Sequence, residues 1–284
     1  MNKKYFLFVV LIVLTVCFLI YDSLRFFDNK LHVVFCNVGQ GDSAFFRTNK
    51  GIDILIDGGP DDKVIACIQK HMPIWDRTID FVFLTHPDAD HLIGLIPVFS
   101  SYKVKNFITQ NVTDNNSAVH QELLIIVKKK RITPRFVFSG QTYSLGEDMS
   151  TFILWPNKKI GGTVAKSSVN NGSIVQKISF GNFDLLMTGD IDAKIFDYLE
   201  KDRDIDVLKV PHHGSKNGMD EKLFTIINPL FAIISVGKNS YGHPSDQVIS
   251  LFRQYTTKVF RTDKQGSIEF VTDGKNMKVY KEKN

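Results

Sequence analysis

Cysteine is scarce in this sequence, with three residues in a chain of 284. Cys17 lies within an apolar run, so only Cys36 and Cys67 could pair in the rest of the chain. Neither of these two belongs to a C-x-x-C pair of the kind found in zinc knuckles. The sequence therefore implies no disulfide framework, and it favours small, buried, unpaired side chains for both cysteines.

Internal repeats are absent, and no linker follows Lys30. Hydrophobic residues make up 43% of the chain and charged residues 23%, which is typical of a globular protein and excludes a disordered one. We therefore expect a single domain over residues 31–284. The formal net charge of +5 permits a nucleic acid or an anionic surface as a partner without requiring either.

A long uncharged segment, YFLFVVLIVLTVCFLIY, lies near the start of the chain. As a helix it would reach about 25 Å, close to the thickness of the hydrocarbon core of a bilayer. No A-x-A cleavage pattern follows it, so residues 1–30 are predicted to be an uncleaved, single-pass membrane anchor. Lys3 and Lys4 precede the apolar segment. The positive-inside tendency therefore places residues 31–284 outside the cytoplasm, at the cell membrane.

The pattern of short apolar stretches predicts an α/β fold. LHVVFCNV, SAFFRT and IDILIDGG read as strands of an antiparallel meander, and later strands such as IDFVFLT, FDLLMTG and DVLKV alternate with helical periodicity. Residues 157–173 read as a polar loop, and SIEFVTDGKNMKVY reads as a closing hairpin. In each half of the body, a meander of strands is followed by strands that alternate with helices. Two sheets packed together, with helices on both outer faces, satisfy this order.

Four strands end in residues that bind metals or transfer protons. FLT precedes His86, LLMTG precedes Asp190, LKV precedes His212 and His213, and ISV precedes the loop that holds His243. Loops at one edge of a rigid scaffold commonly carry function, so these strand ends are expected to converge. Five of the eight histidines occur in these loops. The other three, His32, His71 and His120, have no such context and are assigned structural roles.

The segment HPDADH has the spacing of a two-metal site. His86 and Asp88 can face one point from an extended turn, while Asp90 and His91 can face a second point from the start of a helix. Their nitrogen and oxygen atoms suit zinc or manganese. Asp190 could bridge the two cations, which requires the carboxylates of Asp90 and Asp190 to lie within about 8 Å of each other. Taken alone, DADH would more often be a helix N-cap followed by an exposed histidine.

Six motifs occur in one order: VGQGDS, ILIDGG, THPDADHLIGL, LLMTGD, VLKVPHHGS and SYGHPS. With them the chain resembles the metallo-β-lactamase superfamily, and in particular the extracellular hydrolase domain of the ComEC competence family. The resemblance covers roughly Leu31 to Phe270. It implies a four-layer αββα sandwich with two divalent ions, Zn or Mn, at one edge. Position by position, it assigns the metal-binding loop and the bridging carboxylate to His86, Asp88, Asp90, His91 and Asp190.

The resemblance also implies roles for the later histidines. His212 or His213 would contact the phosphate and His243 would complete the metal shell, although a ligand within HHGS remains an alternative. Asp90, His212 and His213 are therefore the predicted catalytic residues. Many members of the superfamily supply a histidine before the bridging aspartate, whereas this chain has SVNNGS there. Asn171 and Ser173 are the candidates to point toward the site in its place.

Two further aspartates are predicted to support the site. Asp57 in LIDGG could simply form a turn before two glycines, but the resemblance favours a carboxylate that orients a metal-binding histidine. Asp42 lies in the loop after the first strand and could hydrogen-bond to ligands or substrate. Its alternative is an ordinary turn aspartate.

The predicted function is a metal-dependent hydrolase, a phosphodiesterase or nuclease, that acts outside the membrane. DNA suits the competence resemblance, and a cell-surface phosphoester such as phosphocholine suits an anchored exoenzyme equally well. Candidates for contacts with a nucleic acid are Lys209, Lys216, Lys238 and Tyr241, although lysines in such loops are usually only solvated. The alternative function is a membrane-anchored protein that binds DNA or another polymer with little turnover.

Overall fold

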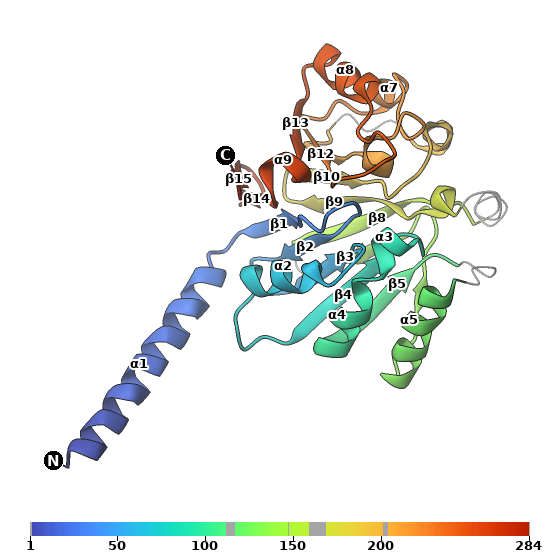
Figure 1. Ribbon diagram of the computed structural model, residues 1–284. Coiled ribbons are helices and arrows are strands. Elements are labelled where there is room, and N and C mark those ends of the chain that lie inside the picture. Colours follow the sequence, from blue (N-terminus) through green and yellow to red (C-terminus); the bar gives the residue numbers. More distant parts are fainter. Residues whose placement is uncertain (1, 112–116, 147, 159–168, 201–203, 284) are drawn as a thin grey trace.

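The computed structural model of the chain describes residues 2–111, 117–146, 148–158, 169–200 and 204–283. Within these residues the strands form two sheets, with the orders β15-β14-β1-β2-β3-β4-β5-β6 and β13-β12-β11-β10-β9-β8-β7. Helices cover the outer face of each sheet (Figure 1). The predicted αββα sandwich is therefore confirmed. Most of the loop predicted over residues 157–173 lies outside the described residues.

The elements have the following bounds. The first sheet contains β1 (Leu31–Phe35), β2 (Ala44–Arg47), β3 (Asp53–Ile56), β4 (Thr78–Leu84), β5 (Lys103–Thr109), β6 (Arg135–Phe136), β14 (Ile268–Thr272) and β15 (Met277–Lys281). The second contains β7 (Thr142–Ser144), β8 (Met149–Trp155), β9 (Val175–Phe180), β10 (Phe183–Met187), β11 (Val207–Lys209), β12 (Phe231–Ile234) and β13 (Lys258–Arg261). The helices are α1 (Lys3–Phe26), α2 (Lys63–His71), α3 (Ala89–Leu92), α4 (Leu95–Ser101), α5 (Ala118–Lys129), α7 (Leu223–Ile226), α8 (Asp246–Gln254) and α9 (Thr262–Gln265), with short 3-10 turns η1 (Asn170–Gly172), η2 (Ala193–Tyr198) and η3 (Pro211–Gly214).

Each sheet changes from antiparallel to parallel pairing along the chain. Strands β1 to β3 pair antiparallel, and β3 to β6 pair parallel. In the second sheet β7 to β10 are antiparallel and β10 to β13 parallel. Parallel neighbours need a crossover, so the helices occur where the pairing becomes parallel. This is the order of meander and alternation that the sequence predicted.

Alternate residues of the strands face different cores. Val33 packs between the two sheets, whereas Val34 packs in the cluster that α2, α4 and α5 cover. In the second sheet, Leu185 faces the central core and Leu186 faces the cluster under α7 and α8. Because both faces of each sheet are buried, the central strands are apolar at nearly every position. A polar residue at a strand end therefore marks the edge of the sandwich.

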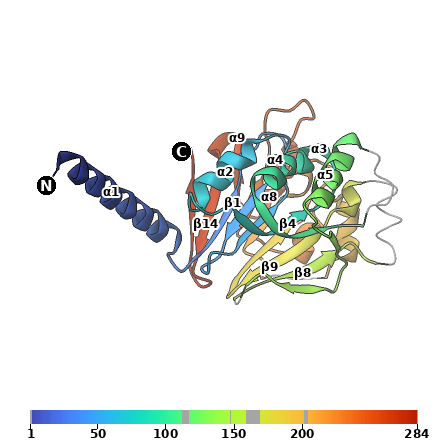
Figure 2. The same cartoon turned by 90° about the horizontal axis from the view of Figure 1, so that it is seen from below.

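Helix α1 stands apart from the body. None of its residues is buried, and Figure 2 shows it projecting from one side of the sandwich. Among the described residues it is the one helix long and apolar enough, by length and composition, to cross a membrane. The division into an anchor over residues 1–30 and a domain over residues 31–284 remains a prediction that suits this arrangement.

The two cysteines of the body form a disulfide bond, Cys36–Cys67. The prediction of unpaired cysteines is therefore wrong, although their burial was predicted correctly, with 1% and 8% of their surface exposed. The bond links the end of β1 to α2 across a Cα–Cα distance of 5.9 Å. That distance depends on how α2 packs on the sheet, and the spacing of two cysteines in the sequence does not encode it.

Candidate metal centre

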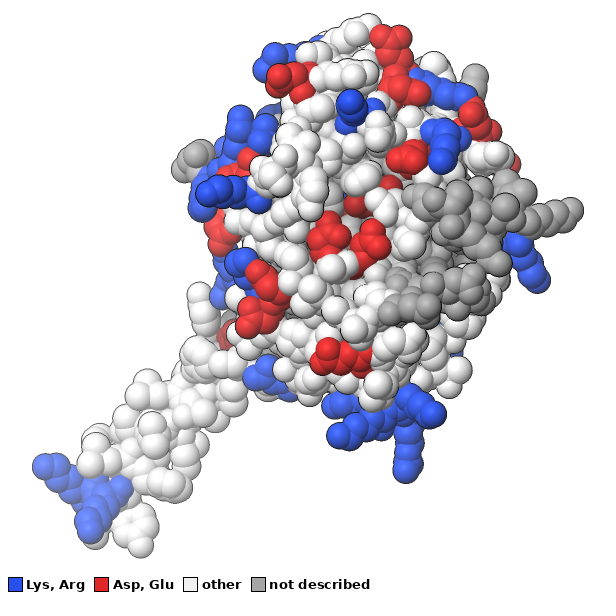
Figure 3. All heavy atoms as spheres, turned by 45° about the vertical axis from the view of Figure 1, so that its right-hand side comes forward, with Lys and Arg blue, Asp and Glu red and all other residues white. Residues whose placement is uncertain are grey.

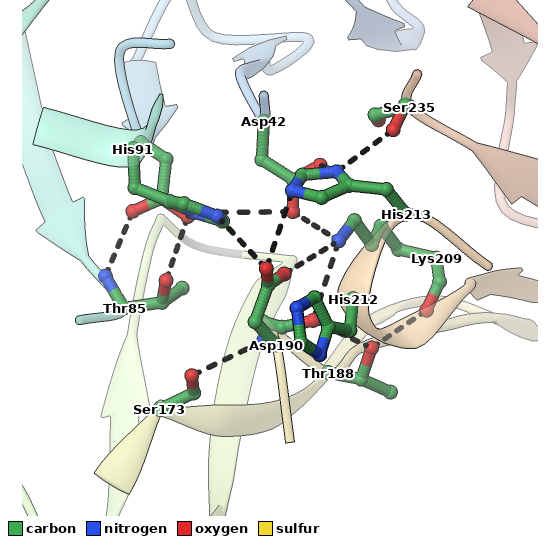
Figure 4. Close-up of polar contacts among 12 residues, drawn as sticks. Asp42, Thr85, His91, Ser173, Thr188, Asp190, Lys209, His212, His213 and Ser235 are labelled. Atoms are coloured by element: carbon green, nitrogen blue, oxygen red, sulfur yellow. Dashed lines mark hydrogen bonds and ion pairs between the residues drawn. The ribbon is translucent and has the colours of Figure 1, made fainter. Parts of the chain in front are cut away.

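The predicted site residues meet at one edge of the sandwich. Asp57 follows β3, His86 follows β4, Asp190 follows β10 and the turn η3 follows β11. These strands belong to the parallel parts of the two sheets, and ligands in α/β folds bind beyond the carboxyl ends of such strands. Figure 4 shows side chains from these separate segments pointing toward one another.

Four side chains form a compact group of potential metal ligands. One ligand atom from each of Asp90, His91, Asp190 and His213 lies within 4.8 Å of every other. Asp190 Oδ2 is 3.3 Å from His91 Nε2 and 3.2 Å from His213 Nε2, and Asp90 Oδ2 is 3.1 Å from His213 Nε2. We call this set the ligand group. The carboxylates of Asp90 and Asp190 thus satisfy the distance that a shared two-metal site requires.

His86 and Asp88 lie beside the ligand group. His86 Nε2 is 3.6 Å from Asp88 Oδ2, and the ring centroids of His86 and His91 are 4.1 Å apart. Both imidazoles are fully buried, and Nε2 of His91 faces Asp190, whereas Nε2 of His86 has no hydrogen-bond partner within the described part of the chain. Buried polar atoms rarely lack partners, so Nε2 of His86 fits a bound cation. His86 and Asp88 therefore form a second cluster of potential ligands next to the ligand group.

Asp57 holds His91 in place. Its carboxylate accepts hydrogen bonds from the backbone N–H of Thr85 at 2.8 Å, the Thr85 hydroxyl at 2.7 Å and His91 Nδ1 at 2.9 Å. A Cβ at Gly94 would lie 1.9 Å from the Gly58 carbonyl oxygen, so these glycines permit the close approach of the two loops. With Nδ1 bound to a carboxylate, His91 presents Nε2 to the ligand group. This is the contact expected of an orienting carboxylate.

Lys209 is buried within the site, whereas the sequence analysis expected it at the surface. As a candidate contact for nucleic acid it should be exposed, but only 1% of its side chain is accessible. Its ammonium forms an ion pair with Asp42 and lies 3.5 Å from Asp190 Oδ1. Residues 207 and 209 share the face of β11 that looks between the sheets, which turns the lysine inward. The one indication in the sequence that Lys209 belongs to the site is its charge, which lies in an apolar strand shortly before HHGS.

The charges in the site balance one another. Burial would raise the pKa of Asp190, but His213, His91 and Lys209 outweigh it and hold that pKa well below the usual range. Burial would lower the pKa of His213, yet Asp190 and Asp42 raise it well above 6.5. In the metal-free protein, protonated imidazoles and Lys209 therefore neutralise the carboxylates. Metal binding at the imidazoles must displace protons.

The later histidines take different places in the site. His213 belongs to the ligand group, whereas His243 lines the same pocket outside that group, and its role as a ligand stays a prediction. The Nδ1 atom of His213 donates to the Ser235 carbonyl at 2.9 Å, which leaves Nε2 for the site. His212 and His243 instead line the pocket over the group, with ring centroids 5.7 Å apart. The sequence could not separate the adjacent histidines because their directions depend on the backbone of η3.

That backbone is unusual. His212 and His213 have φ angles of 49° and 52°, in the left-handed region that most residues avoid. Such conformations cost roughly 1–3 kcal/mol each and persist where the surrounding structure imposes them, often at functional sites. Here the turn brings two consecutive imidazoles to the same site, one to the ligand group and one to the pocket.

The two candidates from SVNNGS do not present ligands to the group. Asn171 is buried and exchanges hydrogen bonds with Asp192, at 2.7 Å and 2.9 Å. Ser173 Oγ donates to the Asn170 carbonyl and accepts from the backbone N–H of Asp190, so it supports the loop that carries Asp190. Asn170, which the sequence reasoning passed over, lines the pocket and lies 3.4 Å from His212 Nε2.

Comparison with known proteins agrees with the motifs. Residues 36–139 match the model of the metallo-beta-lactamase superfamily. The chain is 28% identical to ComE operon protein 3 of Bacillus subtilis (strain 168) over 204 residues, which is 68% of this chain and 25% of that protein. It is 30% identical to Competence protein ComA of Neisseria gonorrhoeae over 258 residues, 86% of this chain and 32% of that protein. The chain thus spans about a quarter to a third of these relatives.

Solved structures show the same fold. The structure of CmlA, a diiron beta-hydroxylase from Streptomyces venezuelae, aligns with a TM-score of 0.53 at 13% identity, over 89% of this chain and 54% of that one. At this identity the likeness concerns the fold alone. The family match, the order of the motifs and the two-sheet architecture together show that the body of the chain is a metallo-β-lactamase superfamily domain, similar in sequence to the competence proteins.

Proposed function

We infer that this chain is a metal-dependent phosphodiesterase that acts outside the membrane. The observation that carries the proposal is the ligand group, in which three distant segments bring two carboxylates and two imidazoles within 4.8 Å. His86 and Asp88 extend this group to a second position, so the donor set fits two divalent cations. When bound, such a pair supplies Lewis acidity that lowers the pKa of water and neutralises phosphate oxygens.

The residues of the site would have different roles. Asp90, His91, Asp190 and His213 would hold one cation, His86 and Asp88 would contribute to the other, and Asp190 would be shared by both. Asp57 orients His91, and the Ser235 carbonyl orients His213. His212 lines the pocket over the ligand group, so its imidazole would hold a proton for the departing oxygen.

DNA is the substrate that we favour within the phosphodiester class. Tyr241 is 74% exposed, stacks on His243 with centroids 5.8 Å apart, and lines the pocket. An exposed ring beside a phosphate site can stack on a base. Lys216 and Lys238 are exposed and remain candidates for backbone contacts, whereas Lys209 is buried. A phosphocholine ester of the cell surface is the competing substrate.

A second function is a binding protein with little turnover. It draws support from the segment before Asp190, where neither Asn171 nor Ser173 offers a ligand. Coordination at that position would depend on water, which would weaken metal binding. Metal content distinguishes the two functions.

The test uses the purified full chain incubated with Mn or Zn. We expect two equivalents of metal and hydrolysis of bis-p-nitrophenyl phosphate that Asp90→Ala abolishes. A panel of single-stranded DNA, duplex DNA and phosphocholine esters then identifies the substrate. Metal-free protein that still binds DNA but hydrolyses nothing would instead establish the binding function.

The location of the body outside the cytoplasm is also part of the proposal. Lys3 and Lys4 precede the apolar segment, and disulfide bonds such as Cys36–Cys67 persist mainly in oxidising compartments. We expect a protease added to intact cells, after wall removal where needed, to degrade the body. Protection of the body in intact cells, followed by degradation after lysis, would reverse the orientation.

A further inference from the structure

The loop between α2 and β4 exposes two apolar side chains beside α1. Ile74 is 59% exposed and Trp75 is 44% exposed. Trp75 lines one shallow pocket together with Val16, Leu19, Ile20 and Ser23 of α1. Trp75 therefore lies level with the last turns of the apolar helix, and we call residues 73–77 the interface loop.

The C-terminal end of α1 contacts the body at two places. The backbone N–H of Ile74 donates to Asp22 Oδ2 at 3.1 Å. The guanidinium of Arg47 lies 5.9 Å and 5.4 Å from the ring centroids of Phe26 and Phe27, and it is itself held by the buried Asp53 at 2.6 Å. These contacts hold the interface loop level with the end of α1.

A basic rim continues from the interface loop along the same edge of the body. It consists of exposed side chains that border one shallow hollow: Lys103, Lys105, Lys130, Arg131 and Arg135. The backbone N–H of Lys103 donates to the Arg77 carbonyl at 2.8 Å, so the rim adjoins the loop directly. Figure 3 shows a group of basic side chains at the bottom of the body, while α1 leaves the body at its lower left.

We propose that the interface loop and the basic rim form one surface that docks on a bilayer containing anionic phospholipids. The proposal rests on α1 spanning the membrane. If α1 spans, a loop level with its last apolar turns cannot avoid the bilayer interface, where tryptophan is favoured. Exposed lysines and arginines next to that interface are attracted by anionic headgroups.

A nucleic acid is the other macromolecule that such cations attract. Phe136, next to Arg135, is 49% exposed and could stack on a base. The bilayer is favoured because the rim is continuous with Ile74 and Trp75, which lie beside the membrane-spanning helix.

Docking would set the position of the candidate metal centre. Strand β4 begins directly after the interface loop, and the metal-binding segment begins directly after its end. Strand β4 has seven residues and extends for roughly 23 Å. The centre then lies at the far end of β4 from the lipid, which suits a polymer outside the membrane better than a lipid headgroup of the same bilayer.

Tryptophan fluorescence of the full chain in vesicles tests the docking. The sequence has two tryptophans, and Trp155 is fully buried with its Nε1 bonded to the Asn171 carbonyl, so a quencher carried by lipid reaches Trp75 alone. With brominated phosphatidylcholine and phosphatidylglycerol, we expect a blue-shifted emission that is quenched by the bromines. Trp75→Phe should lose both effects.

The rim is tested with a charge-matched pair of variants. Lys130→Glu/Arg131→Glu should lower the quenched fraction by about twofold or more in anionic vesicles, whereas Lys216→Glu/Lys238→Glu, near the metal centre, should leave it unchanged. If the protein floats with the vesicles but aqueous iodide quenches its emission and bromolipid does not, the docking is overturned while the membrane span is kept. Protein that does not float would overturn the membrane span as well.

A further outcome separates the two macromolecules. If the rim variant loses binding to a labelled oligonucleotide while Trp75 quenching in anionic vesicles stays at the level of the unmodified chain, the rim serves a nucleic acid and the docking surface is overturned. Hydrolysis of bis-p-nitrophenyl phosphate, measured in the same samples, reports independently on the proposed function.

Discussion

Replacing Asp190 with asparagine is expected to lower kcat/KM for bis-p-nitrophenyl phosphate by about a thousandfold, and to reduce bound metal from two equivalents to one or fewer. Asp190 Oδ2 lies within 3.3 Å of both His91 Nε2 and His213 Nε2, and under the proposed function it is the carboxylate that the two cations share. An amide keeps the shape but removes the shared anion. Loss of several kcal/mol of transition-state stabilisation corresponds to this factor, at 1.36 kcal/mol for each tenfold change.

The control for Asp190→Asn is Asp192→Asn, two residues further along the same loop. Asp192 pairs with Asn171 and lies outside the ligand group, so the variant makes the same chemical change without removing a ligand. Metal content is measured by elemental analysis, and activity is measured across a range of added Mn. Retention of two metals by Asp190→Asn, or an equal loss in Asp192→Asn, would contradict the bridging role.

Replacing Lys209 with methionine is expected to lower the free energy of unfolding of the metal-free protein by about 3–5 kcal/mol. The ammonium of Lys209 pairs with Asp42 and lies near Asp190, and all three side chains are almost completely buried. Methionine fills a similar volume but leaves two carboxylates without their cation. Removing one partner of a buried ion pair has effects of this size because an unpaired charge remains in the interior.

Added metal should restore part of that loss. A cation bound beside Asp190 replaces positive charge that Lys209 supplied, and ligands that bind only the native state stabilise it. Urea unfolding in chelator and in Mn therefore forms the test, and the variant should gain more stability from Mn than the unmodified chain. Lys105→Met is the control, since the side chain of Lys105 is 51% exposed and its pair with Asp80 is expected to contribute less than about 1 kcal/mol. A metal-free Lys209→Met protein as stable as this control would show that the buried pair contributes little.

The sequence predicted the fold well where local periodicity carries the information. The meander and the alternation of strands and helices were both legible, and the predicted hairpin at the end of the body is the antiparallel pair β14 and β15. Helix α8, Asp246–Gln254, likewise has a local signal, because the Ser245 side chain caps its first turn. Such elements follow from the spacing of apolar residues and from capping within a few positions.

Predictions that depended on distances between segments fared less well. Cys36 and Cys67 were expected to be unpaired, and Lys209 was expected at the surface. In each case the sequence showed the residue but not the side chains that contact it in the folded protein. A side chain's neighbours from distant segments are set by packing between layers, which no short window of sequence contains.

By itself, the sequence determined which chemical groups the site would have: imidazoles and carboxylates at the carboxyl ends of strands, in motifs whose spacing fits two cations. The tertiary structure decided which of them meet. The turn η3 directs His213 to the ligand group and His212 to the pocket, and the inward face of β11 places Lys209 beside Asp190. Ligand identity is a property of residue type and local spacing, whereas the partners of a buried charge are fixed only when the two sheets close on each other.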